Sequence, residues 1–146
     1  MLKFRVFTTF IVIALFSTTS VFADGNDSKA EELIDKHQTK ISKAKVKDWK
    51  TYAECASELV SLRINNEEIL SWINKSIEIK ETVFNRTVKG DFLVLAGEYV
   101  SAKKEYIKAI SLAQQSGDKK IIPDLQWKIL IAMGMENYHN FHANQK

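Results

Sequence analysis

The chain has 146 residues, of which 45% are hydrophobic and 27% are charged, the balance of an ordinary single-domain globular protein. Its formal net charge is +3, but the first 23 residues contain Lys3 and Arg5 and no acidic residue. Without those two, 19 basic side chains face 18 acidic ones, and lysines and glutamates are interleaved along the chain. This balance gives no reason to expect a nucleic acid or an anionic membrane as a partner.

The first 23 residues have the pattern of an export signal. Lys3 and Arg5 precede an apolar stretch from Val6 to Phe16, and Val21-Phe22-Ala23 supplies the small residues that a signal peptidase reads. We therefore expect cleavage after Ala23 and an exported mature chain, periplasmic or secreted, that is not held at a membrane. The competing interpretation is an uncleaved anchor, for which the apolar stretch is shorter than the ~20 residues that span a bilayer.

Residues 24–47 are predicted to form an entry helix and a turn. Ser28-Lys29-Ala30-Glu31 fits a capping box, which places the helix start at Ser28 after a polar, frayed beginning. An apolar stripe then recurs at helical spacing through Ala30, Leu33, Ile34, His37 and Ile41. His37 is interpreted as a residue at the boundary of this stripe and not as a catalytic base.

Two helical hairpins and a final helix are predicted after this turn. Asp48 caps a helix that Asn65-Asn66 ends, and a second helix completes a hairpin over residues 49–79. The next hairpin runs from Val83 to Ser116, with a turn at Gly97 and a C-cap at Gly117. A last helix starts at Pro123-Asp124 and ends near residue 137, and residues 140–146 form a polar tail. No run alternates as a strand does.

The second helices of the two hairpins show an internal repeat. Ala102, Tyr106 and Ala109 are four and three residues apart, so they share one helical face in a small-large-small pattern that allows close packing. The corresponding face 33 residues earlier consists of Ile69, Ile73 and Ser76. These six residues are the predicted packing positions of a repeat.

These residues resemble a tetratricopeptide repeat (TPR), whose second helix carries a small-x3-aromatic pattern followed by another small residue. Gly90-x2-Leu93 occupies the family's G-x2-Y position, and Gly97 with Tyr99 stands at the inter-helix turn. Arg86 replaces the expected Trp, Gln114 replaces the expected Pro, and the period is 33 residues where ~34 is usual.

The resemblance implies an all-α fold: a short, right-handed array of antiparallel helix hairpins over residues 48–139, with the last helix as a cap on the exposed end of the stack. A weaker likeness connects NNEEILSWINKSIEI and VKGDFLVLAGEY to the helical tails of exported bacterial proteins of unknown function. That second likeness implies no activity.

Residues with reactive side chains are few. His139-x2-His142 places two imidazoles on one helical face near Glu136, but a structural zinc site needs four ligands. Cys55, the single cysteine, has apolar neighbours on its side of the helix, so burial is the simpler interpretation and pairing between two chains is the alternative. Trp49, Trp72, Tyr99, Tyr106 and Trp127 are interpreted as core residues.

The sequence therefore favours an exported, non-catalytic interaction module without a cofactor. The inner surface formed by the first helices would bind an extended peptide or a partner protein. The alternative is a small helical enzyme or metal-handling protein that uses His139, His142 and Glu136. The partner's identity and the oligomeric state are left open.

Overall fold

The computed structural model describes residues 25–145, and every regular element in that range is helical. The helices are α1 (Gly25–Ser42), α2 (Trp49–Ser61), α3 (Glu67–Ile79), α4 (Val83–Leu95), α5 (Tyr99–Ser116), a 3-10 turn η1 (Lys119–Ile121) and α6 (Ile122–Ala143). The all-α prediction is confirmed. The predicted export signal and its cleavage site lie outside the described residues.

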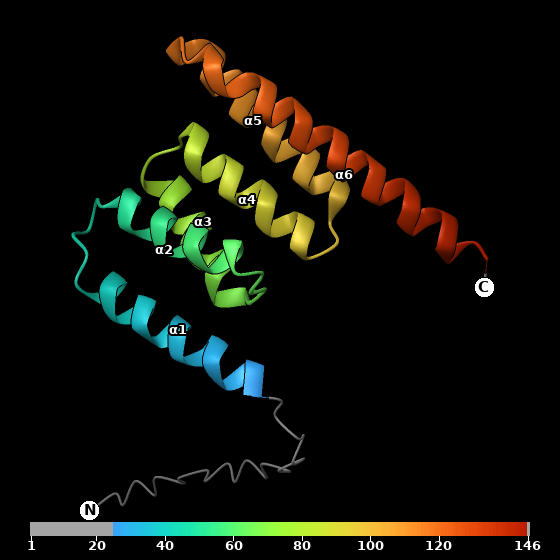
Figure 1. The fold of residues 1–146 in the computed structure, drawn as a ribbon. Helices are drawn as coiled ribbons and strands as arrows, with labels where there is room; N and C mark the ends of the chain where they lie inside the picture. Colours follow the sequence, from blue (N-terminus) through green and yellow to red (C-terminus); the bar gives the residue numbers. More distant parts are fainter. Residues whose placement is uncertain (1–24, 146) are drawn as a thin grey trace, which may run out of the picture.

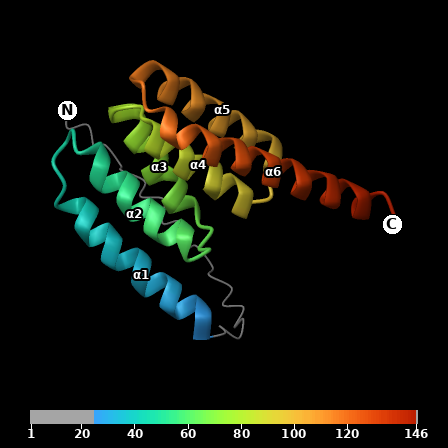
Figure 2. The ribbon, with the colours of Figure 1, turned by 45° about the horizontal axis from the view of Figure 1, so that its top comes forward.

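The helices form a layered stack of antiparallel neighbours (Figure 1). α2 pairs with α3, α4 pairs with α5, and α6 runs back along α5, while α1 packs on α2 at the opposite end. A second view keeps the same order, with α4 between the α2–α3 pair and the α5–α6 pair (Figure 2). α4 is therefore the central element, and residues on it can face both sides of the molecule.

Local signals fix several helix ends as the sequence predicts. The Asp48 carboxylate accepts hydrogen bonds from the Thr51 amide at 3.2 Å and from the Thr51 hydroxyl at 2.7 Å, which caps α2. Asn66, which the sequence predicted only as part of a helix end, accepts a hydrogen bond from the Glu68 amide at 2.7 Å and caps α3. Gly117 ends α5 with φ 76°, a conformation that L side chains rarely adopt.

Three predicted helix ends are wrong. α2 ends at Ser61, four residues before Asn65. α1 begins at Gly25, so Ser28 lies inside the helix and not at its start. α6 continues to Ala143, and the predicted polar tail at residues 140–146 is helical over its first four residues. The extension follows a stretch in which Glu136 and His139 still contact α5, so side-chain contacts stabilise the helix near residue 137, where the sequence predicted its end.

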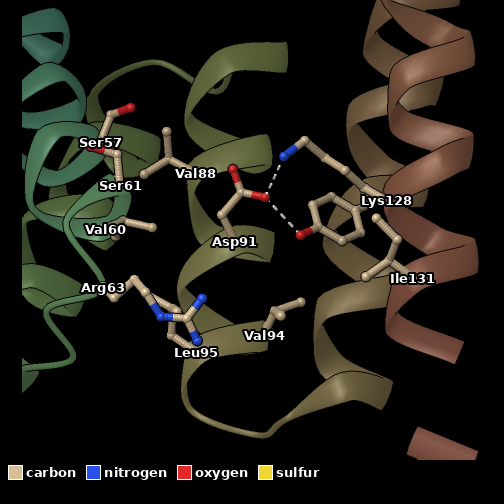
Figure 3. A pocket seen from close by; sticks show the side chains of 11 residues that line it. Ser57, Val60, Ser61, Arg63, Val88, Asp91, Val94, Leu95, Lys128 and Ile131 are labelled. Atoms are coloured by element: carbon tan, nitrogen blue, oxygen red, sulfur yellow. Dashed lines mark hydrogen bonds and ion pairs between the residues drawn. The ribbon is translucent and has the colours of Figure 1, made fainter. Parts of the chain in front are cut away.

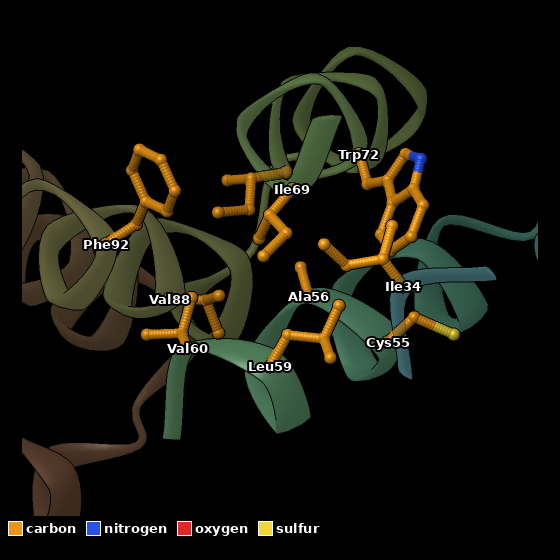
Figure 4. Packing of buried hydrophobic residues seen from close by; sticks show 10 residues of the cluster. Ile34, Cys55, Ala56, Leu59, Val60, Ile69, Trp72, Val88 and Phe92 are labelled. Atoms are coloured by element: carbon orange, nitrogen blue, oxygen red, sulfur yellow. The ribbon is translucent and has the colours of Figure 1, made fainter. Parts of the chain in front are cut away.

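Most of the core lies between α2, α3 and α4. This cluster, shown in Figure 4, is built on Ile34, Cys55, Ala56, Leu59, Val60, Ile69, Trp72, Ile73, Val88 and Phe92. Cys55 is fully buried with a free thiol, and burial raises its pKa above the ordinary value. A second cluster joins α4, α5 and α6 through Leu93, Ala102, Tyr106, Ala109, Leu125 and Ala132.

All six predicted packing residues are buried: Ile69, Ile73, Ser76, Ala102, Tyr106 and Ala109. On α5 the small residues let α4 approach closely. A β-carbon added to Gly90 would lie 2.3 Å from Cε1 of Tyr106, so the tyrosine ring fills the space that the glycine leaves. Gly90 is needed here for close packing.

Ser76 also joins three helices through its hydroxyl group. It donates to the Trp49 carbonyl at 2.8 Å and accepts from the Asn85 side chain at 3.0 Å. Asn85 is itself fully buried, bonds the Lys80 carbonyl, and forms a capping box with Thr82 at the start of α4. This network ties the beginnings of α2 and α4 to the end of α3, with every polar atom of the asparagine amide in use.

The last helix does not have the polar outer face of a cap. Trp127, which the sequence assigned to the core, is 62% exposed, and other large apolar side chains of α6 are exposed with it. Leu125 and Ala132 fill the inward face. α6 therefore has apolar side chains on two opposite faces. Helical periodicity alone cannot tell which of the two faces is buried.

Candidate functional site

An open cavity of about 320 Å³ lies between α2, α4 and α6. Its walls are mainly apolar and come from Val60, Val88, Val94, Leu95 and Ile131, with Ser57, Ser61, Arg63, Asp91, Tyr106 and Lys128 as the polar members. Figure 3 shows these side chains between the green, olive and brown helices. We call this cavity the α2–α4–α6 groove.

Asp91 organises the polar part of the groove. Its Oδ1 atom accepts hydrogen bonds from the Tyr106 hydroxyl at 2.7 Å and from Lys128 Nζ at 2.8 Å (Figure 3). Burial raises the pKa of Tyr106, and the Asp91 carboxylate raises it further, so the phenol remains a hydrogen-bond donor at any physiological pH. The three residues come from α4, α5 and α6 and lock those helices together at the groove floor.

Arg63 lies at the edge of the groove, in the turn after α2. Its φ of 63° is the one positive value among the described non-glycine residues. A left-handed conformation costs a residue with a β-carbon about 1–2 kcal/mol. Its side chain is exposed, and none of the ion pairs formed within residues 28–145 involves it. The groove thus has one cationic group available to a ligand.

A second polar cluster stands at the position where the sequence departs from the repeat pattern. Arg86 Nη1 donates to Glu105 at 2.7 Å and Nε donates to Glu81 at 2.6 Å, and Lys108 also reaches Glu105. Burial alone would raise the pKa of Glu105, but the bonds from Lys108 and Arg86 outweigh it and lower that pKa. Arg86 therefore joins α4 to α5 through an ion pair with Glu105.

The C-terminal histidines do not come together as a ligand set. His142 packs edge-on against Tyr138 and Phe141, with ring centroids 4.3 and 5.3 Å apart, and His139 lies near Tyr99. The Glu136 carboxylate pairs with Lys103. Within residues 28–145 no three His, Cys, Asp or Glu side chains are grouped as a metal site would require.

His37 is buried more deeply than a boundary residue. Both ring nitrogens lack a hydrogen-bond partner, although Nε2 lies 3.5 Å from a carboxylate oxygen of Glu58. That distance is at the outer limit for a hydrogen bond, and the geometry does not make one. The imidazole therefore acts mainly as a packing group between α1 and α2.

Sequence reasoning missed the groove residues Asp91, Lys128 and Arg63. Asp91 and Lys128 are 37 positions apart on different helices, and neither belongs to a recognisable motif. Tyr106 was selected as a packing residue, and its hydroxyl gave the only signal pointing to a polar partner, because a buried phenol nearly always finds one.

No family model, no curated protein and no solved structure matches this chain. None of the helices within residues 25–145 is long and apolar enough to cross a bilayer. The site must therefore be interpreted from its own geometry.

Proposed function

We propose that this protein is an exported, non-catalytic interaction module with a TPR-like arrangement, and that the α2–α4–α6 groove binds an extended peptide segment of a partner protein. The observation that carries the proposal is the origin of the groove walls. α2 and α4 are the first helices of two successive hairpins, and α6 follows them in chain order as the first helix of a third hairpin would. In helical-repeat arrays such a surface is the usual binding face.

The packing positions support the same arrangement. Small residues on α5 flank Tyr106, and Gly90 on α4 receives its ring, which is the contact that the repeat resemblance implies. Arg86 stands where the TPR pattern has Trp. In this proposal its ion pair with Glu105 joins the two helices of the hairpin in place of the Trp contact. The right-handed course of the array is part of the proposal.

The groove chemistry defines the peptide class. Aliphatic walls favour apolar side chains, and Asp91 and Lys128 satisfy each other's charge. Arg63 remains available for a carboxylate, which a guanidinium can bind in a bidentate manner. The preferred ligand is therefore an extended peptide with alternating apolar residues and an acidic group near one end.

A displayed library of short peptides tests this specificity. Peptides selected by the parent chain are expected to contain apolar residues and an Asp or Glu, and Arg63→Glu is expected to weaken their binding at least tenfold in a fluorescence titration. Lys104→Glu, the same charge reversal on the exposed face of α5, should leave binding unchanged. Equal affinity of the two variants, or selected peptides without acids, would refute the groove assignment.

Export is tested separately from binding. We expect the intact mass of the protein purified from the envelope fraction of its host to correspond to a chain that begins at Asp24. A mass that includes Met1, found in the membrane fraction, would favour an uncleaved anchor. Affinity capture from the same envelope fraction would then identify the natural partner.

A further inference from the structure

The outward face of α6 carries an apolar stripe. Trp127, Leu130, Ile131, Tyr138 and Phe141 lie within about 100° of one another around the helix, since each residue advances by about 100°. They point away from the buried Leu125 and Ala132. Four of the five are more than half exposed: Trp127 (62%), Leu130 (57%), Tyr138 (69%) and Phe141 (61%). We call this set the α6 stripe.

The α6 stripe has no charged side chain. α6 contains Asp124, Lys128 and Glu136, apart from histidines. Lys128 and Glu136 are committed to Asp91 and Lys103 of the same chain, and Asp124 stands in the first turn. Asp124 borders the stripe, three residues before Trp127 on the same side of the helix. The stripe is uncharged and rich in aromatic side chains, whereas the groove has Arg63 available, and the two surfaces meet at Ile131.

Gly134 lies at the centre of the stripe, and none of the described residues requires a glycine there. Its backbone is helical, and a β-carbon added there would meet no atom of residues 28–145 within 4 Å. Glycine in a helix interior is destabilising by roughly 0.8–1.0 kcal/mol relative to alanine. Its lack of a side chain becomes useful when another helix crosses close to this point.

The stripe is symmetric about this glycine. Trp127 and Phe141 stand seven residues before and after Gly134, and Leu130 and Tyr138 stand four before and four after. We propose that α6 mediates a homodimer, in which two copies cross antiparallel with the two-fold axis at Gly134. Trp127 of each copy then packs on Phe141 of the other, and Leu130 packs on Tyr138, as an isologous interface requires.

The size of the stripe suits a weak to moderate dimer. With aromatic side chains able to bury ~150–250 Å² each, the five stripe residues expose on the order of 500–600 Å² per chain. Two copies would bury about 1,100 Å² from these residues alone, close to the ~1,200 Å² at which stable interfaces begin, and neighbouring polar residues add to it.

The position of α6 favours the antiparallel arrangement. The end of α6 extends beyond α4 and α5 in both views (Figures 1 and 2), and Phe141 lies in this extension. In an antiparallel pair this end lies along the first turns of the partner's α6, which α5 supports from behind. Opposed helix dipoles add a favourable term, which a parallel pair lacks.

Sedimentation equilibrium of protein produced from the full coding sequence tests the proposal. We expect dimers at micromolar concentration, and Leu130→Glu is expected to raise the dissociation constant at least tenfold. Ile107→Glu is the matched control, because Ile107 on α5 has the same 57% exposure and lies outside the stripe. A monomer at 100 times that concentration, or equal effects of the two variants, would overturn the proposal.

Cysteine cross-linking tests the symmetry. Gly134→Cys should form a disulfide-linked dimer under mild oxidation, because helices that cross there bring their Cα atoms within disulfide range. Ile107→Cys should not, and Cys55 is buried in every variant. Cross-linking of Trp127→Cys in preference to Gly134→Cys would overturn the antiparallel geometry. If the chain that retains residues 1–23 is monomeric, removal of these residues is a second test: dimers of the shortened chain would support the interface, and a monomer at the same concentration would overturn it.

Discussion

The ring of Tyr106 lies directly against the backbone of Gly90, so that a β-carbon on the glycine would come within 2.3–2.8 Å of three ring atoms. The contact joins the central helix α4 to α5 at the point where the Tyr106 hydroxyl reaches Asp91. Packing in the core and polar order in the groove therefore depend on the same pair of residues.

Gly90→Ala is expected to destabilise the protein. The added methyl group cannot fit beside a ring that is bonded to Asp91, and overpacking of this kind typically costs ~1–3 kcal/mol. Gly134→Ala is the matched control, because the same change in an open helical position should be neutral or stabilising by up to ~1 kcal/mol. Urea unfolding at submicromolar concentration, below the range in which we propose that dimers form, measures both. Equal stability of the two variants would place the Tyr106 ring elsewhere.

Tyr106→Ala should unfold at much lower denaturant concentration than the parent. Tyr106 is 2% exposed, and removal of a large buried aromatic ring leaves a cavity that costs ~3–5 kcal/mol. Tyr106→Phe keeps the ring and loses only the bond to Asp91, so a cost of roughly 0.5–1.5 kcal/mol is expected. Lys104→Ala, on the exposed face of the same helix, should lie within ~0.5 kcal/mol of the parent. If Tyr106→Ala melts like Lys104→Ala, the packing face is wrongly assigned.

The sequence predicted the parts of this fold that depend on local chemistry. Caps at Asp48 and Gly117 act within a few residues, so they can be predicted without a structure, whereas Asn66 was predicted only as the end of a helix and in fact caps the next one. The face shared by Ala102, Tyr106 and Ala109 was equally readable, because helical periodicity alone places these residues together.

The remaining features depend on how separate helices are oriented. The hydrogen bond between Asp91 and Lys128 forms only if α4 and α6 are each turned so that these two side chains face one another. Residue spacing along the chain does not predict that orientation. Trp127 was assigned to the core from the burial tendency of aromatic residues. α6 has apolar side chains on both faces, and only the position of α5 decides which face is covered. Arg63 lies at the edge of the groove because its backbone has a positive φ, which is uncommon for a residue other than glycine and which the sequence of this turn does not predict.

Acid should destabilise the protein through Glu105. The folded-state pKa of Glu105 lies below its ordinary value of 4.5, so this carboxylate contributes stability that is fully present above pH 4.5. That contribution is lost as the pH falls through the folded-state pKa. Glu105→Gln should cost roughly 1.5–3 kcal/mol near neutral pH, as for hydrogen bonds to charged groups, and the difference from the parent should shrink in acid. Glu98→Gln, at an exposed position, is the control. A difference that does not change between pH 7 and pH 3 would contradict this role.

His37→Leu is expected to leave stability unchanged or to raise it. His37 is buried between α1 and the core with both ring nitrogens lacking a hydrogen bond, and an unpaired polar group in such a place costs about 1–3 kcal/mol. Leucine fills similar space without that cost, whereas His37→Ala should lose stability by leaving a cavity. Within residues 28–145 Glu58 is the one carboxylate that pairs with the ring, at 3.5 Å, and it is largely exposed, so Glu58→Gln should change stability by less than ~1 kcal/mol. Thermal unfolding of the three variants distinguishes packing from pairing: if His37→Leu and Glu58→Gln both destabilise the chain by similar amounts, the imidazole is held by Glu58 and is not simply a packing group.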